Sequence, residues 1–327
     1  MSMLDDVLAQ PEQLGDALWR AQSAGIPAQD RPGGLIVCGM GGSAIGGDLA
    51  AAALGDRATR PITTVRGYAL ESWTGPDSLV LCASYSGNTE ETLACFEAAG
   101  AAGAGRVVLT TGGQLAELAR AEGVPVIGVP AGMQPRAAVV YMVVGALECA
   151  ALCGAAPGVH AEIDTAAELL RTISPADAEP IAETLRGTVP VVHGAGSTSA
   201  IARRWKTQTN ENAKATAFFS ELPEANHNEI CFWQRSAEAG RFSGVFLEDP
   251  DQHPRIKRRI DLTAAEVELG GAAVVRVPAR GETRLERVLS LVMLGDLVSV
   301  RLAELAGVDA DEIEALVRLK DSLVDKP

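Results

Sequence analysis

Short, unbroken apolar runs alternate with longer Ala- and Leu-rich stretches through the first half of this sequence. The runs lie at 35–38, 62–65, 79–82, 107–110 and 126–129. A strand that is apolar on both faces belongs to a sheet covered on both faces, and helices between successive strands make that sheet parallel. The first half is therefore predicted to be a doubly wound α/β unit.

The second half repeats this pattern. Apolar runs that predict a second parallel sheet lie near 189–193, 215–219, 244–247 and 273–277, and helical patterns cover 283–306 and 310–323. The glycine-rich segment at 35–47 (LIVCGMGGSAIGG) resembles the one at 189–202 (VPVVHGAGSTSAIA). Each is typical of a strand, a tight turn and a helix. Whether the second turn binds a ligand or keeps its glycines only for turn geometry stays open at this point.

The length of 327 residues suits two domains of ordinary size. Glycine and proline at 154–160 mark a boundary between them. The prediction is an α/β protein with two doubly wound parallel-sheet domains related as a divergent repeat. The first domain covers 1–153 and the second covers 154–327.

The charge of the chain limits its partners. The sequence has 28 basic and 42 acidic residues, a formal net charge of −14, which repels nucleic acid and anionic membranes at long range. We therefore expect neither nucleic acid nor a membrane as a partner. A site for an anionic substrate would need local compensation from backbone N–H groups, hydroxyls or a few cations.

One segment is apolar enough to raise the question of a membrane span. Residues 137–156 carry a single charge, Glu148, over a length that could cross a bilayer. Alanine and glycine dominate the segment and no basic cluster flanks it, so we prefer a helix buried in a domain core or a subunit interface.

The cysteines indicate the compartment. The six cysteines form no CxxC pair and no Cys/His cluster at metal-ligand spacing, which is typical of reduced core residues in a cytosolic protein without a metal site. The N-terminus shows no signal-peptide pattern. We expect a cytoplasmic protein.

The glycine-rich turn after the first strand is a candidate phosphate site. Gly41, Gly42 and Ser43 begin a predicted helix, where backbone N–H groups are unpaired and glycine lets a ligand approach closely. Gly39, Gly41 and Ala44 also fit a loose dinucleotide fingerprint, and Arg66 follows the next strand. An NADP-dependent oxidoreductase is therefore one alternative.

A second polar segment follows the strand at 79–82. It places the hydroxyls of Ser84, Ser86 and Thr89 at another helix start. Hydroxyls and backbone N–H groups can ligate a terminal phosphate without lysine. Helix capping by Ser86 or Asn88 is the competing explanation, but one cap accounts for one hydroxyl only. The dinucleotide alternative gives these hydroxyls no task, so the sequence favours a phosphate site without a cofactor.

These motifs resemble a known family. The segments GMGGSAIGGD (39–48) and SYSGNTEET (84–92) resemble the paired phosphate-binding segments of sugar isomerase (SIS) domains. The runs NENAK (210–214) and PEANHNE (223–229) are similar to those of the bifunctional phosphoglucose/phosphomannose isomerase family, and the resemblance covers nearly the whole chain.

The resemblance implies roles for individual residues. Ser43, Ser84, Ser86 and Thr89, with the turn at Gly41 and Gly42, match the phosphate ligands. Glu211 matches the catalytic base, His227 the ring-opening residue, Arg136 the cation beside the reacting carbons and Lys320 the C-terminal lysine. The resemblance also implies a homodimer with shared active sites, in which the partner supplies the histidine, and it implies neither a metal nor a cofactor.

The implied reaction interconverts fructose 6-phosphate with glucose 6-phosphate, mannose 6-phosphate or both. A proton moves between C1 and C2 through an enediolate, which requires one carboxylate that accepts and returns it, as Glu211 could. Arg136 would stabilise the oxyanion, and His227 could supply the imidazole that ring opening needs. On position alone His193, at the end of a predicted strand, competes with His227.

One segment departs from the family pattern. Where members often carry Thr-Pro before the C-terminal lysine, this chain has Val308 followed by the acidic stretch 309–313. An acidic side chain directed at the sugar would weaken turnover. The second alternative is therefore a catalytically weak or inactive phosphosugar-binding protein on the same fold.

Overall fold

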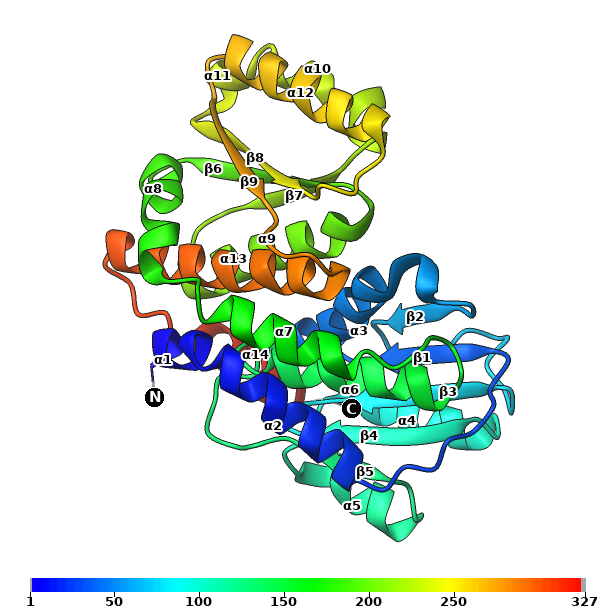
Figure 1. Cartoon of the computed structure of the whole chain (residues 1–327). Helices are drawn as coiled ribbons and strands as arrows, with labels where there is room; N and C mark the ends of the chain where they lie inside the picture. The colour runs from blue at the N-terminus through cyan, green and yellow to red at the C-terminus, as the bar shows by residue number, and fades with distance from the viewer. Residues whose placement is uncertain (1, 325–327) are drawn as a thin grey trace.

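Two parallel sheets form the framework of the molecule (Figure 1). The computed structural model describes residues 2–324. The first sheet has the order β2-β1-β3-β4-β5 and consists of β1 (Gly34–Cys38), β2 (Ile62–Val65), β3 (Ser78–Ala83), β4 (Gly105–Thr110) and β5 (Val126–Gly128). The second has the order β7-β6-β8-β9 and consists of β6 (Val189–Gly194), β7 (Phe218–Glu221), β8 (Phe242–Glu248) and β9 (Ala273–Pro278). The predicted α/β fold with two parallel sheets is confirmed.

Helices cover both faces of each sheet. Those of the first half are α1 (Met3–Leu8), α2 (Gln10–Ser23), α3 (Gly41–Leu54), α4 (Glu90–Ala101), α5 (Gly113–Ala121) and α6 (Val139–Leu152). Those that follow are α7 (His160–Leu170), α8 (Pro175–Leu185), α9 (Ser199–Asn212), α10 (Ile230–Trp233), α11 (Ser236–Ala239), α12 (Pro254–Leu269), α13 (Arg284–Ala306) and α14 (Glu314–Val324). Short 3-10 turns are η1 (Gly55–Arg57), η2 (Gly196–Thr198) and η3 (Glu224–His227).

The strand orders reveal the repeat. With β6 equivalent to β1, the order β7-β6-β8-β9 reproduces β2-β1-β3-β4. The similarity of the two glycine-rich segments therefore extends to the topology of both halves. The two sheets also fall on opposite sides of the predicted boundary at 153/154, while the boundary itself remains a prediction.

Strand β7 begins later than the sequence indicates. The pattern predicts a strand from residue 215, but β7 starts at Phe218. The chain first turns back on α9: Asn210 Nδ2 donates to the Ala215 carbonyl at 2.8 Å, and Lys214 adopts a left-handed φ of 52°. Backbone groups engaged in this turn cannot join the sheet, so the strand starts after it.

One continuous core joins the two halves. The inner face of the first sheet packs through α2, α3 and α6 onto α7 and α13, and α13 packs through α8 and α9 onto the second sheet. Figure 1 shows α13 lying between the two sheets. Smaller cores fill the outer faces, under α4 and α5 on the first sheet and under α10 and α12 on the second.

Helix α6 is the centre of this core. Every residue from Val139 to Ala150 is buried, including a valine-rich run that intrinsic propensity would place in a strand. Burial on all sides overrides that preference. The predicted buried helix is confirmed, and its place is the core of the chain itself and not a subunit interface. No helix in the described part of the chain is long and apolar enough to cross a membrane.

The glycine-rich segment divides between two tasks. A Cβ on Gly46 would lie 2.4 Å from Met142 Cβ, and one on Gly47 would lie 2.8 Å from Val37 Cβ. These two glycines therefore let α3 pack closely on α6 and the sheet. Gly41, the first residue of α3, has a φ of 51° and open space around it, so it belongs to the tight turn that leads into the helix.

The cysteines are reduced, and five of the six are buried. The expectation that all lie in the core is wrong for Cys231, which is exposed on α10 next to α12. The neighbours of Cys231 are apolar, but they form the four-residue helix α10, in which Trp233 is the buried residue.

Candidate active site

The predicted phosphate segments meet at the topological switch point of the first sheet. Strands β1 and β3 are neighbours, yet the chain continues from β1 toward β2 on one side and from β3 toward β4 on the other. Ligands of open α/β sheets bind at this place, beyond the carboxyl ends of the strands. The backbone N–H of Tyr85 donates to Ser43 Oγ at 3.3 Å, so the two segments are in direct contact.

The hydroxyls of the second segment are not used to cap α4. Its N-cap is Thr89, which makes no side-chain cap bond, so the capping explanation is wrong. Ser84 Oγ, which is buried, lies 2.8 Å from Thr89 Oγ1 and accepts the Gly87 N–H at 3.1 Å. Ser86 is exposed at the same loop. Hydroxyls and N–H groups thus converge where an anion can be bound.

Arg136 lies beside the first turn. A Cβ on Gly42 would approach Arg136 Cα to 3.0 Å, so the backbone of the β5–α6 loop touches the turn itself. Tyr85 fixes the same loop to the second segment, because its hydroxyl accepts the Met133 N–H at 2.9 Å and lies 3.1 Å from the Pro130 carbonyl. The resemblance implies that Arg136 is the cation beside the reacting carbons, and the structure places its backbone against the turn of the predicted phosphate site.

Arg136 and Glu211 form an ion pair. Arg136 Nη1 lies 3.1 Å from Glu211 Oε1. The guanidinium is 2% exposed, whereas the carboxylate is 32% exposed, so the base candidate reaches solvent while the cation is fixed behind it. Arg136 Nε also donates to Asn212 Oδ1, and Nη1 reaches Gln134 Oε1 at 3.3 Å. Such a guanidinium can stabilise negative charge that develops beside Glu211.

A buried network of hydrogen bonds fixes the position of Arg136. Arg204 makes a bidentate pair with Asp296 at 3.0 and 2.7 Å, and its Nη2 also donates to the Arg136 carbonyl at 3.0 Å. Asn212 Nδ2 donates to Ser299 Oγ at 2.8 Å. Because Asp296 and Ser299 belong to α13, the helix between the sheets sets the position of the candidate cation.

The acidic segment 309–313 covers Arg136 with its backbone. Arg136 Nη2 donates to the Ala310 carbonyl, and Lys214 Nζ donates to the Asp309 carbonyl. The Asp309 carboxylate accepts the Asp311 N–H at 2.8 Å, and the Asp311 carboxylate accepts the Met3 N–H at 3.3 Å. Both carboxylates are thus engaged by N–H groups of the loop and the N-terminus. Partial burial and the nearby Arg136 charge lower the pKa of Lys214.

Two of the predicted residues make no polar contact with this cluster in the described part of the chain. His227 is exposed on η3 of the second half, and Lys320 is exposed on α14. Within residues 2–324, no hydrogen bond or ion pair joins either side chain to Glu211 or Arg136.

The rival histidine is a core residue. His193 is 2% exposed, stacks on Phe246 with ring centroids 4.6 Å apart, and lies 5.9 Å from the Trp233 ring. Burial lowers the pKa of His193 to about 4. A ring enclosed in this way cannot reach a substrate.

The cation on which the dinucleotide alternative depends is already paired. Arg66 Nη2 bonds to the carboxylate of Asp48 on α3. The guanidinium that would neutralise a 2′-phosphate therefore has its counter-charge within the protein.

Sequence reasoning missed the residues that orient the site. Asn212 lies inside the NENAK run but received no role, and Arg204 and Asp296 carry no motif at all. A signal for the last two existed in the amphipathic patterns of α9 and α13, where a charged residue falls on the buried face.

Comparison with known proteins identifies the family of the chain. Residues 175–323 match the model of the bacterial phospho-glucose isomerase C-terminal SIS domain. The chain is 38% identical over 294 residues to a bifunctional phosphoglucose/phosphomannose isomerase of Aquifex aeolicus (strain VF5), covering 89% of this chain and 90% of the relative. It is 34% identical to the protein of the same name from Caldicellulosiruptor bescii, covering 99% of each chain.

The fold also matches solved structures. The C-terminal domain of glucosamine-fructose-6-phosphate aminotransferase from Francisella tularensis superimposes with a TM-score of 0.71 at 15% identity, covering 95% of this chain and 97% of that one. This match supports the double-sheet architecture. The sequence identities over nearly the whole length show more: the chain belongs to the bifunctional phosphoglucose/phosphomannose isomerase family, whose members are intramolecular oxidoreductases.

Proposed function

We propose that this protein interconverts fructose 6-phosphate with glucose 6-phosphate, mannose 6-phosphate or both, through an enediolate and without a metal. The observation that carries the proposal is the pair formed by a buried guanidinium and a solvent-accessible carboxylate, Arg136 and Glu211, next to the hydroxyl-rich switch point.

The phosphate end of the substrate is bound at the switch point. The hydroxyls of Ser43, Ser84, Ser86 and Thr89, with backbone N–H groups at the turn of Gly41 and Gly42, supply the donors. They compensate locally for the net charge of −14. The acyclic sugar then extends toward Arg136, whose backbone touches that turn.

The proton transfer is assigned to Glu211. Its carboxylate takes the proton from C1 of fructose 6-phosphate and returns it to C2 on the same face. Arg136 stabilises the enediolate oxyanion with a charge that is held in place before the substrate arrives, so little reorganisation accompanies the reaction. The Asp309 and Asp311 carboxylates are held by N–H groups, which favours catalysis over the binding-only alternative.

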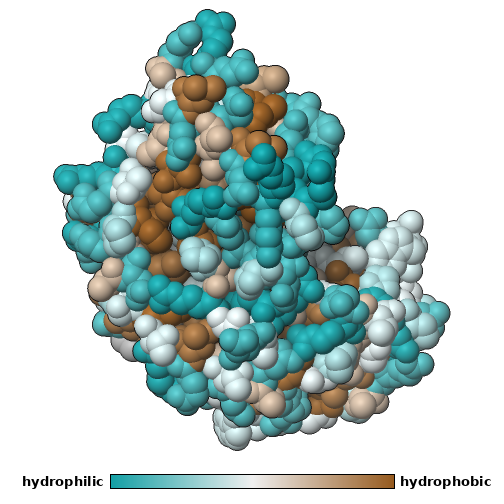
Figure 2. Space-filling model, turned by 45° about the horizontal axis from the view of Figure 1, so that its top comes forward, coloured by the Kyte–Doolittle hydropathy of each residue, from teal (hydrophilic) through white to brown (hydrophobic). Residues whose placement is uncertain are grey.

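The roles of His227 and Lys320 are assigned to a homodimer. His227 of a second copy opens the sugar ring, and Lys320 on α14 contributes a positive charge near the substrate. Support comes from hydrophobic surface in the half that carries His227, visible as brown areas in the upper part of Figure 2. Between residues 189 and 278 of this half, the exposed large apolar side chains are Phe218, Phe232, Leu262 and Leu269. Such surface marks a protein interface more often than a solvated face.

A coupled assay tests the reaction. Fructose 6-phosphate is supplied with a chelator, and glucose 6-phosphate and mannose 6-phosphate are read separately. We expect product in the wild-type protein and none in Glu211→Gln, which keeps the size of the side chain but cannot accept the proton. Glu238→Gln, an exposed glutamate on α11 paired only with Arg235, is the matched control and keeps full activity. Near-normal turnover in Glu211→Gln contradicts the assigned base.

Subunit complementation tests the shared site. Glu211→Gln and His227→Ala are each inactive alone. When they are co-expressed, mixed dimers regain one intact site if the histidine comes from the partner. No recovery, with mixed dimers isolated by two affinity tags, contradicts the shared site.

A further inference from the structure

The second sheet has its own switch point, at the place equivalent to the candidate phosphate site. In the first sheet Cys38 pairs with Cys82, and in the second His193 pairs with Phe246. Gly41 lies three residues after Cys38, and Gly196 lies three residues after His193. Both glycines are left-handed, with φ of 51° and 57°. On the neighbouring strands, Tyr85 lies three residues after Cys82, and Asp249 lies three residues after Phe246. Asp249 is therefore the equivalent of Tyr85, whose N–H donates to Ser43 Oγ in the first half.

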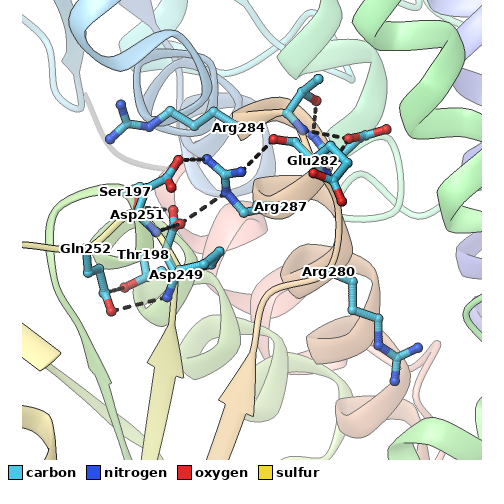
Figure 3. A network of polar contacts seen from close by, with 12 residues as sticks. Ser197, Thr198, Asp249, Asp251, Gln252, Arg280, Glu282, Arg284 and Arg287 are labelled. Carbon is cyan, nitrogen blue, oxygen red and sulfur yellow. Dashed lines mark hydrogen bonds and ion pairs between the residues drawn. The ribbon is translucent and has the colours of Figure 1, made fainter.

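A carboxylate of the chain itself lies at this second switch point. Asp249 is 3% exposed and is held by two hydrogen bonds and one ion pair (Figure 3). Ser197 Oγ donates to Asp249 Oδ2 at 2.7 Å, Arg287 Nε lies 3.1 Å from Oδ1, and the Asp251 N–H donates to Oδ1 at 2.9 Å. A hydroxyl, a guanidinium and a backbone N–H are the donors with which proteins bind small oxyanions.

We propose that Asp249 is a built-in ligand of a second oxyanion site, so that each chain binds one sugar phosphate and not two. The statement about sugar phosphate rests on the proposed function of the first site. The statement about the second site rests on Asp249, Ser197 and Arg287 alone.

The charges of the site explain why it accepts no further anion. Arg287 is buried, and besides Asp249 it bonds to the Asp251 carboxylate and to the Glu282 carbonyl. Its one positive charge therefore already faces two carboxylates. An added phosphate would be repelled by both carboxylates.

Removing the Asp249 carboxylate should let the second site bind a small anion from solution. Asp249→Gly deletes a group with the composition of acetate and leaves Ser197 and Arg287 facing the vacated space. A buried guanidinium that loses one counter-charge destabilises the fold. Acetate or formate from solution can restore the missing contacts. Inorganic phosphate is larger and tests how far the space can widen.

Thermal unfolding of the variants tests the built-in ligand. We expect Asp249→Gly to melt below the wild-type protein and to recover in a saturable way with sodium acetate, while sodium chloride of equal ionic strength has no such effect. Asp249→Asn fills the space with a neutral amide and is the matched control, which loses stability without recovery. If acetate raises the melting temperature of Asp249→Gly no more than that of Asp249→Asn, the proposal is overturned. If Asp249→Gly does not fold, Asp249→Ala is measured in the same way.

Counting ligands in the wild-type protein gives a test without substitution. Equilibrium dialysis with labelled glucose 6-phosphate is expected to give one bound molecule per chain, and two per chain would overturn the proposal. If no glucose 6-phosphate binds at all, the proposed function of the first site fails. The acetate experiment then still decides the nature of the second site.

Discussion

The ion pair between Arg204 and Asp296 should hold both the fold and the active site, and Asp296→Asn tests this. The two side chains are 1% and 0% exposed. Asp296 accepts two bonds from Arg204 and one from Gln10 at 2.8 Å. The amide keeps the shape of the side chain but removes the charge, so Arg204 stays buried without a counter-charge.

The expected cost follows from this burial. Removing one partner of a buried ion pair typically costs about 3–5 kcal/mol, whereas an exposed pair contributes about 0–1 kcal/mol. Urea unfolding followed by circular dichroism should show the loss as a lower midpoint for Asp296→Asn. Glu238→Gln, which breaks the exposed pair with Arg235, should leave the midpoint in place.

A second substitution separates charge from packing. Arg204→Met in the Asp296→Asn background removes the uncompensated charge, so the double variant should be more stable than the sum of the single losses. Turnover should fall in Asp296→Asn and in the double variant, because Arg204, which Asp296 holds in place, also donates to the Arg136 carbonyl. A loss below about 1 kcal/mol in Asp296→Asn, or strict additivity in the cycle, would refute the reasoning.

Three further outcomes are expected. Burial lowers the pKa of His193 from 6.5 to about 4, so the unfolded chain binds the extra proton first. Stability should then fall as pH drops from 6.5 to 4, by on the order of 3 kcal/mol, and His193→Leu should flatten that part of the urea-midpoint profile. Gly42→Ala should lower kcat, since its Cβ would press on the Arg136 backbone at 3.0 Å, whereas Gly15→Ala on α2 meets nothing within 4 Å and should keep it. A thiol reagent should modify one cysteine in the folded protein, Cys231; labelling of more than one would contradict the burial of the others.

Local sequence patterns predicted the two parallel sheets well, because in each half strands alternate with helices that cover both faces of the sheet. A parallel sheet buried on both faces appears in the sequence as unbroken apolar runs separated by helical segments. The hydroxyl loops were predictable for the same reason, because a switch point gathers the residues that follow neighbouring strands. Ser43 and Ser84 needed no long-range information to be brought together.

The residues that act across the chain were not predictable in this way. Asp296 and Arg204 lie 92 positions apart, and only packing of α13 on α9 makes them partners. The acidic stretch 309–313 shows the same limit, since its charges suggested interference while its backbone in fact accepts from Arg136 and Lys214. The direction of a carboxylate depends on which N–H groups lie nearby, and a sequence does not display that.

Isomerisation in heavy water tests the central claim most directly. Fructose 6-phosphate is incubated with the protein in D₂O, and the aldose phosphate formed is analysed by NMR for deuterium at C2. The Glu211 side chain is 32% exposed, so part of the proton it takes up exchanges with solvent before it is returned. The account therefore predicts partial deuterium at C2 of the wild-type product, which rises on prolonged equilibration, and no product from Glu211→Gln. Product that stays free of deuterium at C2 after prolonged equilibration, or labelled product from Glu211→Gln, would contradict proton transfer by this residue.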